Sequence, residues 1–127
     1  LAWPVQGRII GKFGTTRNPN TGVVTENVGV DIQVKGGTAV KSVLDGVVST
    51  ITYIRGHGNI IIIDHGGGFS TVYAQIDNIT VHENEYVQMD NPIASVANPE
   101  ENTPAKLHFE VWGNQKKLNP EHWLIKK

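Results

Sequence analysis

The chain has 127 residues, 39% of them apolar, which is enough for one domain that buries roughly two thirds of its unfolded surface. Its formal charge is −1 and its only lysine pairs are at 116–117 and 126–127, so it lacks the basic footprint that nucleic acid requires. The absence of cysteine excludes disulfides and thiolate metal sites, and no apolar run approaches the roughly 20 residues that cross a membrane.

The sequence shows no sign of a second domain. It begins at Leu1 without a signal-peptide pattern and contains no internal repeat, linker or low-complexity segment. We therefore expect residues 1–127 to form a single domain. We also expect it to be a mature product or a fragment of a longer protein, in which it would form the C-terminal part.

The first 25 residues predict one strand and one loop. Residues 7–14 hold a short apolar run with glycines at both ends, which is typical of a strand, and Trp3 is expected to pack nearby. Residues 15–25 contain Asn-Pro-Asn and Thr-Gly without periodicity, which predicts a loop. A loop of this length in a compact domain often forms the wall or lid of a groove.

The middle of the chain predicts strands joined by glycine turns. Residues 27–34 alternate polar with apolar and end at a Gly-Gly turn. Residues 38–43 and 47–54 are predicted to pair as a hairpin through the turn dipeptide Asp45-Gly46. The four consecutive isoleucines at 60–63 predict a strand that is buried on both faces.

Two turns flank the isoleucine run, and each contains a histidine. Because His57 and His65 lie in glycine-rich turns, we expect them to be structural or solvent-facing rather than metal ligands. The strand after the second turn covers residues 69–75. Three short apolar pieces follow between residues 79 and 96, and residues 98–104 predict a polar loop.

The last predicted strand, at 106–112, alternates strictly between polar and apolar residues. Alternate side chains of a strand face opposite sides, so one side should carry three polar residues: Lys106, His108 and Glu110. A helical turn is predicted at 120–124, with Asn119 as its cap. Short strands, glycine turns and almost no helical periodicity together predict an all-β domain.

A histidine on the polar face of a late strand needs a partner, and the best upstream candidate is Asp31. Gln75, at the end of the strand at 69–75, is a third polar position. We expect the segments that carry these residues and His108 to line one groove. Two interpretations remain open for Tyr73, which either points into the groove beside Gln75 or packs in the core.

Several short motifs occur in a characteristic order. They are Gly29-Val30-Asp31, Asp45-Gly46-Val47-Val48, Gly58-Asn59 before the isoleucines, Asp64-His65-Gly66, Thr71-Val72-Tyr73-Ala74 and Leu107-His108-Phe109-Glu110. In this order the chain resembles the LytM or lysostaphin-like zinc peptidases of cell-wall turnover, from Trp3 to Leu124. Each motif alone is weak, and the ordered set is highly specific. The resemblance implies a single domain of antiparallel sheets, of the duplicated hybrid motif type, with an open groove.

In that family, zinc is held by a histidine, by an aspartate four residues later and by the second histidine of a His-x-His pair. A histidine after Tyr-Ala and the first histidine of the pair act on the water and the transition state. The resemblance carries these functions to five positions of this chain: Asn27, Asp31, Gln75, Lys106 and His108. Only Asp31 and His108 keep the residue type of the family.

The three replacements all oppose catalysis by zinc. Asn27 offers a neutral amide oxygen, a poor zinc ligand beside imidazole, and Gln75 cannot exchange a proton near neutrality. Lys106 places a fixed cation beside the position of a dication, which opposes metal binding. We therefore predict no metal cofactor and no catalytic residue. We hypothesise that the ammonium of Lys106 takes the place of the metal against Asp31.

The spacing of Asn27 and Asp31 requires a bend in the backbone between them if both are to lie at one site. In a flat strand, residues four apart are separated by about 13 Å, too far to share one ion. The arrangement of the family needs a bend between them, and Gly29 is where we expect it. The backbone of the site is thus expected to be present although its ligands are not.

Three functions are compatible with these observations, and we rank them in this order. The resemblance to degenerate LytM domains of murein hydrolase activators implies an inactive domain in the periplasm or cell envelope. Its groove, with Tyr73 as a further candidate residue, would bind and activate an N-acetylmuramoyl-L-alanine amidase or another cell-wall hydrolase. The alternatives are a peptidoglycan-binding module and, last, a zinc endopeptidase with an unusual ligand set. Both signs of charge line the groove, which suits a protein partner.

Overall fold

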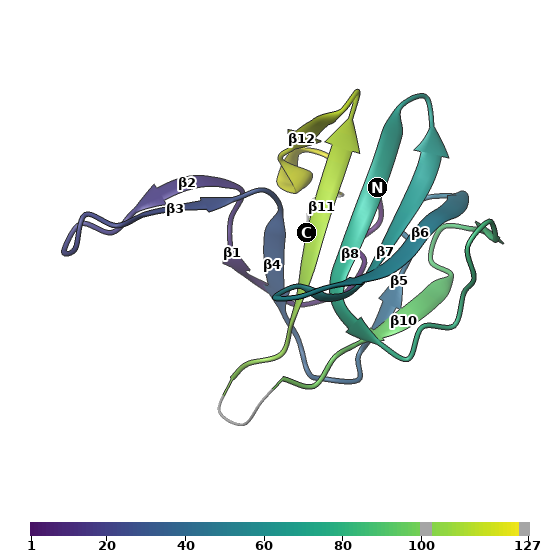
Figure 1. The fold of residues 1–127 in the computed structure, drawn as a ribbon, viewed down its shortest axis with the longest axis horizontal. Coiled ribbons are helices and arrows are strands. Elements are labelled where there is room, and N and C mark those ends of the chain that lie inside the picture. Colours follow the sequence, from purple (N-terminus) through teal and green to yellow (C-terminus); the bar gives the residue numbers. More distant parts are fainter. Residues whose placement is uncertain (100–102, 125–127) are drawn as a thin grey trace.

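The fold is built almost entirely from short strands, as Figure 1 shows for the computed structural model, which describes residues 1–99 and 103–124. The strands are β1 (Arg8–Gly11), β2 (Gly14–Arg17), β3 (Val24–Asn27), β4 (Val30–Gln33), β5 (Ala39–Lys41), β6 (Gly46–Ile54), β7 (Gly58–Gly66), β8 (Phe69–Asp77), β9 (Tyr86–Val87), β10 (Pro92–Val96), β11 (Lys106–Gly113) and β12 (Lys116–Leu118). In the described ranges the only helical segment is the 3-10 turn η1 (Pro120–His122), capped by Asn119. The predictions of an all-β domain and of this C-terminal turn are confirmed.

Some of the predicted features lie outside the described residues. These are residues 100–102 of the loop predicted at 98–104, and the lysine pair at 126–127. Within the described part of the chain, no helix has the length and hydropathy of a membrane span.

One antiparallel sheet contains most of the strands. Its order is β1-β4-β11-β8-β7-β6-β9, while β12 pairs with β11, and β10 pairs with both β8 and β5. This order places β4, β11 and β8 side by side in the middle of the sheet. As a result Asp31 and His108, which are 77 residues apart in the sequence, lie on neighbouring strands.

The sheet has two different faces, because alternate residues of a strand point to opposite sides. One face packs the main core, in which Ile61, Tyr73 and Phe109 are each fully buried. The opposite face carries a smaller apolar cluster: Ile60, Val72 and Ala74. The isoleucine run therefore contributes side chains to both clusters, which confirms the predicted strand that is buried on both faces.

Tyr73 belongs to the core and does not line a groove. Its exposed fraction is 0%, and its ring centroid lies 5.3 Å from that of Phe109, its pairing partner on β11. Its hydroxyl accepts the Val43 N–H at 3.2 Å and lies 2.8 Å from the hydroxyl of Thr71. The assignment of Tyr73 to the groove was wrong, because the residue shares the face of Phe109 and not that of His108.

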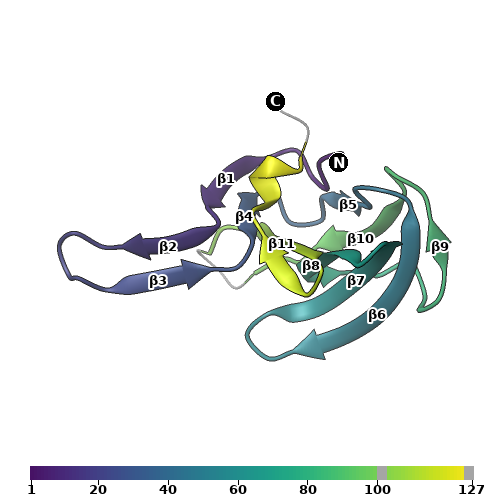
Figure 2. The same ribbon diagram turned by 90° about the horizontal axis from the view of Figure 1, so that it is seen from above.

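The segment predicted as a loop at 15–25 is mostly a two-stranded ribbon. β2 and β3 pair from Gly14↔Asn27 to Arg17↔Val24, and residues 18–23 close the turn. Among the described residues the two strands pair only with each other, and Figure 2 shows that the ribbon projects from the body of the domain. The loop prediction failed because most of the ribbon's residues are exposed, so its sequence lacks the apolar alternation that marks a half-buried strand.

The hairpin predicted through Asp45-Gly46 does not form. β5 pairs with β10, whereas β6 pairs with β7 and β9. The carboxylate of Asp45 accepts the backbone N–H of Met89 at 2.7 Å and lies 3.3 Å from the hydroxyl of Tyr86. These contacts reach more than 40 residues along the chain, so non-local pairing overrides the local turn pattern.

The chain bends at Val28 and Gly29, between β3 and β4, as predicted. The bend brings Asn27 Nδ2 to 3.3 Å from Asp31 Oδ2, so two residues four apart meet at one site. A Cβ at Gly29 would lie 2.3 Å from the carbonyl oxygen of Phe109. Glycine is required here for the close approach of two backbones.

Candidate functional site

Three neighbouring strands and the ribbon bring the predicted site residues together. Asp31 on β4 pairs with His108 on β11, and His108 in turn pairs with Ala74 of β8, next to Gln75. Lys106 precedes His108 by two residues on β11, and Asn27 is the last residue of β3. Five of the six residues predicted for the site therefore meet, and only Tyr73 lies elsewhere.

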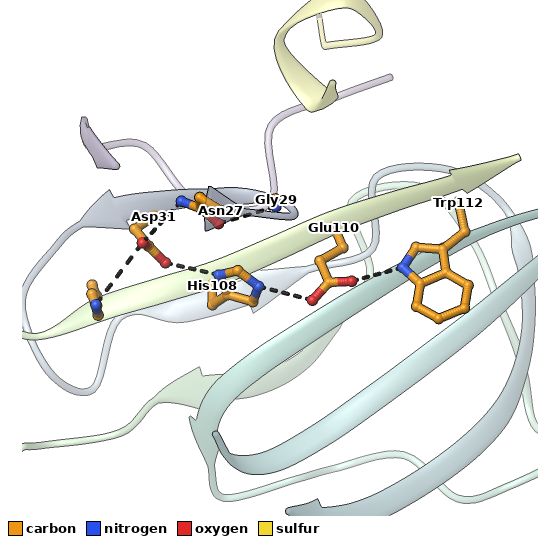
Figure 3. Close-up of polar contacts among 7 residues, drawn as sticks. Asn27, Gly29, Asp31, His108, Glu110 and Trp112 are labelled. Atoms are coloured by element: carbon orange, nitrogen blue, oxygen red, sulfur yellow. Dashed lines mark hydrogen bonds and ion pairs between the residues drawn. The ribbon is translucent and has the colours of Figure 1, made fainter. Parts of the chain in front are cut away.

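A chain of polar contacts crosses the site from β4 to β11, as drawn in Figure 3. Asn27 donates from Nδ2 to Asp31 Oδ2 at 3.3 Å. The other carboxylate oxygen of Asp31 lies 2.8 Å from His108 Nδ1. On the far side of the ring, His108 Nε2 lies 2.8 Å from Glu110 Oε2. The two residues that match the zinc ligands of the family are thus bonded to each other.

The residues at both ends of this series of polar contacts, Asn27 and Glu110, make further hydrogen bonds. Asn27 Oδ1 accepts the backbone N–H of Gly29 at 3.1 Å, which fixes the orientation of the amide. Glu110 Oε1 accepts the indole N–H of Trp112 at 2.7 Å. Buried polar groups destabilise a fold when they lack partners, so a fully paired chain can be accommodated in this partly buried position.

Lys106 adds a looser contact to the same carboxylate. Its Nζ lies 3.9 Å from Asp31 Oδ2, and its side chain is 35% exposed. The distance is that of an ion pair rather than of a hydrogen bond. The geometry agrees with the hypothesis that Lys106 supplies positive charge to Asp31, although His108 makes the shortest contact.

His108 is held as an imidazolium. Each ring nitrogen faces a carboxylate oxygen, which can only accept, so both nitrogens must carry a proton. Burial acts to lower the pKa of His108, but its hydrogen bonds to Asp31 and Glu110 and their charges outweigh burial and raise the pKa to about 9. Burial acts to raise the pKa values of Asp31 and Glu110, and the contacts with His108 outweigh it and lower both.

A β-bulge directs Gln75 into the groove. Its φ is 64°, in the left-handed region, and the register between β7 and β8 shifts beside it. Its N–H donates to the carbonyl of His57 and its carbonyl accepts the N–H of Ala97, each at 3.0 Å. The bulge interrupts the regular alternation of β8, so that Gln75 lines the groove while Tyr73 faces the core.

The site opens into a groove of about 610 Å³. Its floor contains five of the predicted residues: Asn27, Asp31, Gln75, Lys106 and His108. Of its walls, only residues within 15–25 were expected from the sequence. The walls are formed on one side by Ile9, Ile10, Gly11, Lys12, Gly14, Thr16, Thr25 and Glu26, and on the other by Gly56 and His57. The expectation that residues 15–25 border a groove is confirmed, although they do so as a ribbon.

The two turn histidines have different positions. His57 is exposed at the edge of the groove, and its ring centroid lies 6.3 Å from that of His108. No sequence signal marks this position, because the β6–β7 turn sets it. His65 is structural, since its Nδ1 lies 2.7 Å from the Asp45 carbonyl oxygen and its Nε2 lies 2.8 Å from the Thr71 hydroxyl.

The donor atoms of the site do not match those of a catalytic zinc centre. Such a centre needs three good protein ligands and an open position for water. Here Asn27 directs its amide nitrogen toward Asp31, and both ring nitrogens of His108 face carboxylates. Across the described residues, no group of three or more His, Cys, Asp or Glu side chains is placed to hold a metal ion.

The all-β fold and the groove over β4, β8 and β11 define a domain of the LytM-like peptidase class. The sequence model of peptidase family M23 matches residues 25–120 of this chain. The chain therefore belongs to peptidase family M23. The resemblance inferred from the ordered motifs is confirmed.

Relatives with assigned names align with nearly the whole chain. Outer membrane antigenic lipoprotein B of Haemophilus influenzae is 36% identical over 123 residues, which cover 96% of this chain and 28% of that protein. The murein hydrolase activator NlpD of Escherichia coli is 32% identical over 123 residues, covering 96% and 30%. The structure of Helicobacter pylori Csd3 matches with a TM-score of 0.84 and 27% identity, covering 100% of this chain and 35% of that one. The chain thus spans about a third of each of these proteins.

The raised pKa of His108 predicts that the domain loses stability in mild alkali. The folded value of about 9 exceeds the ordinary 6.5, so the imidazolium stabilises fully below pH 6.5 and its contribution, about 3 kcal/mol, is lost as the pH rises to 9. The lowered pKa values of Asp31 and Glu110 contribute stability that is lost only in acid, as the pH falls through those values. The lowered pKa of His65 reduces stability only below pH 6.5. Urea denaturation at pH 6 and pH 9.5 measures the difference.

Two histidine variants provide the control for this measurement. His108→Gln should remove the loss of stability between pH 6.5 and 9, whereas His82→Gln, at an exposed position, should retain it. An unchanged pH dependence in His108→Gln would contradict the assignment of the effect to the imidazolium.

The bulge at Gln75 predicts a gain in stability on substitution by glycine. Gln75→Gly should raise the free energy of unfolding by about 1 kcal/mol relative to Gln75→Ala, because glycine adopts a φ of 64° without steric strain. Both variants remove the same amide from the groove, so their difference isolates the backbone strain. Chemical denaturation measures it, and equal stabilities would show that the bulge stores no strain.

Proposed function

We propose that this domain is a catalytically inactive M23 domain that binds and activates an N-acetylmuramoyl-L-alanine amidase in cell-wall remodelling and daughter-cell separation. The observation that carries the proposal is the contact of 2.8 Å between Asp31 and His108. These residues match two ligand positions of the family, and here they satisfy each other. We therefore propose that the domain functions without zinc.

The remaining groups of the floor support inactivity. Peptide hydrolysis needs an activated water and a group that moves a proton near neutral pH. Gln75 has no titratable proton, and His108 is an imidazolium whose two N–H groups both face carboxylates. Asn27 contributes a neutral amide that already donates to Asp31. The carboxylate of Asp31 is engaged by Asn27, His108 and Lys106, so none of the five floor residues is free to act as a general base.

The groove supports a binding function with a protein partner. Its volume of about 610 Å³ is open and its lining includes Lys12, Glu26 and Lys106, so charges of both signs face a ligand. Relatives with the name murein hydrolase activator support a hydrolase as the partner. A relative with the name outer membrane lipoprotein supports a position in the cell envelope. We propose that residues 1–127 act as one module of a longer protein.

The first test is metal content and cleavage. We expect the purified domain to contain no stoichiometric zinc and to leave peptidoglycan uncut with or without added zinc, because the floor lacks a third ligand and a general base. Elemental analysis and release of soluble muropeptides measure the two quantities. Stoichiometric zinc together with cleavage would contradict the proposal and favour an endopeptidase.

The second test is activation of the partner. Lys106→Glu should lower stimulation of an amidase from the same organism by about tenfold, because it places a second carboxylate beside Asp31 and reverses the charge offered to the partner. Gln75→Trp should also lower stimulation by about tenfold, because the larger side chain fills part of the groove. Peptidoglycan hydrolysis by the amidase with and without the domain is the readout, and thermal melts confirm that each variant folds.

Lys116→Glu is the matched control for the charge reversal, since Lys116 lies on β12 and does not line the groove. It should leave stimulation unchanged. Full stimulation by both groove variants would show that another surface contacts the amidase. Binding of the wild-type domain to peptidoglycan, with no stimulation of any amidase, would favour a wall-binding module.

A further inference from the structure

The β2–β3 ribbon is a small sheet with two free edges. Among the described strands, β2 pairs only with β3 and β3 only with β2. Figures 1 and 2 show the ribbon extending from the body of the domain. A two-stranded ribbon is marginally stable alone, and a third strand would stabilise it.

The pairing pattern identifies the backbone groups that face outward. The Asn18 N–H donates to the Val23 carbonyl at 2.8 Å, so this position is a hydrogen-bonded pair. Hydrogen-bonded and non-hydrogen-bonded pairs alternate in an antiparallel ladder. The pairs Arg17↔Val24 and Thr15↔Glu26 are therefore non-hydrogen-bonded. On β3, the N–H and C=O groups of Val24 and Glu26 point away from β2.

The outer edge of β3 faces the groove. Thr25, Glu26 and Asn27 are consecutive, and all three line the groove, which is possible when a cavity lies along the edge of a strand and not only under one face. β2 contributes only the alternate residues Gly14 and Thr16. In both Figure 1 and Figure 2, β3 lies nearer than β2 to the β6–β7 turn, which carries the opposite wall.

The sequence of β3 protects this edge only weakly. Exposed edge strands are usually blocked by short length, charged side chains, proline, a bulge or a covering segment. β3 is short and carries one charge, at Glu26, but it contains neither proline nor lysine and pairs with β2 in a regular register. Its residues Val24 and Thr25 are β-branched, and Val24 is 60% exposed. This edge therefore offers what an added strand needs.

We propose that the groove-facing edge of β3 pairs with an extended segment of a partner protein, which becomes the third strand of the ribbon. The proposal rests on the proposed function and specifies how the partner is held. The backbone of an extended peptide is the chemistry that recognises a row of outward N–H and C=O groups. The wall that such a segment meets holds Ile10, Thr16 and Thr25 beside the charged Lys12 and Glu26, so the segment that fits combines uncharged side chains with charged ones.

The test removes one outward N–H and leaves the ribbon's own bonds intact. Glu26→Pro deletes the donor on the proposed edge, and its pairing partner Thr15 offers a matched control, because Thr15→Pro deletes an outward donor on the opposite edge of the same ribbon. Glu26→Ala controls for the side chain. We expect Glu26→Pro to bind the full-length amidase about tenfold more weakly than Glu26→Ala does, and Thr15→Pro to stay within about twofold of wild type.

Amide hydrogen exchange of the wild-type domain tests the same edge without a substitution. The amides of Val24 and Glu26 should exchange more slowly in the amidase complex, and that of Thr15 should not change. Wild-type binding without this protection, or equal effects of Glu26→Pro and Thr15→Pro, would overturn strand pairing alone. Failure of the wild-type domain to bind any amidase would overturn the proposed function and this inference with it.

Discussion

The contact on which the groove depends is an imidazolium held between two carboxylates. Asp31 and Glu110 each lie 2.8 Å from one nitrogen of His108. A buried carboxylate destabilises a fold unless a charge and hydrogen bonds compensate for its desolvation. Each member of this group therefore requires the other two, and together they fix β4 against β11 at the register that the groove needs. The floor is consequently a rigid surface and not an open ligand set.

Two backbone features direct side chains into the groove independently of the chemistry that those side chains carry. The bend at Gly29 turns Asn27 back toward Asp31, and the bulge at Gln75 reverses the alternation of β8. Both features place a residue at a position where the family has histidine, and both would serve a histidine equally well. The fold thus fixes where these two side chains lie, and the type of side chain at each position determines whether the site suits catalysis or binding. Under the proposed function, this separation lets an M23 fold serve for binding in place of catalysis.

The sequence predicted those parts of the site that follow from periodicity and from ordered motifs, namely His108 opposite Asp31 and the isoleucine strand that is buried on both faces. The sequence-based prediction was wrong where one extra residue in a β-bulge shifts the alternation of a strand. Tyr73 and Gln75 are two apart and should share a face, but the bulge between β7 and β8 separates them. It also failed where both faces are exposed, as in the ribbon, because no apolar pattern then marks the strands. The position of His57 in the groove wall depends on a turn that pairs with distant residues.

The charges of the floor limit what can be recognised there. His108 and Lys106 carry two positive charges, and Asp31 and Glu110, of which only Asp31 lines the groove, carry two negative charges. These four charges cancel, and the hydrogen bonds of Asn27, Asp31 and His108 are internal, so on the floor a ligand gains mainly by contact with Lys106 and Gln75. Outward backbone groups lie on the rim of the groove as well, along the outer edge of β3. On the proposed strand pairing, backbone groups of the ribbon add affinity to the contacts that a partner makes with Lys106 and Gln75 on the floor.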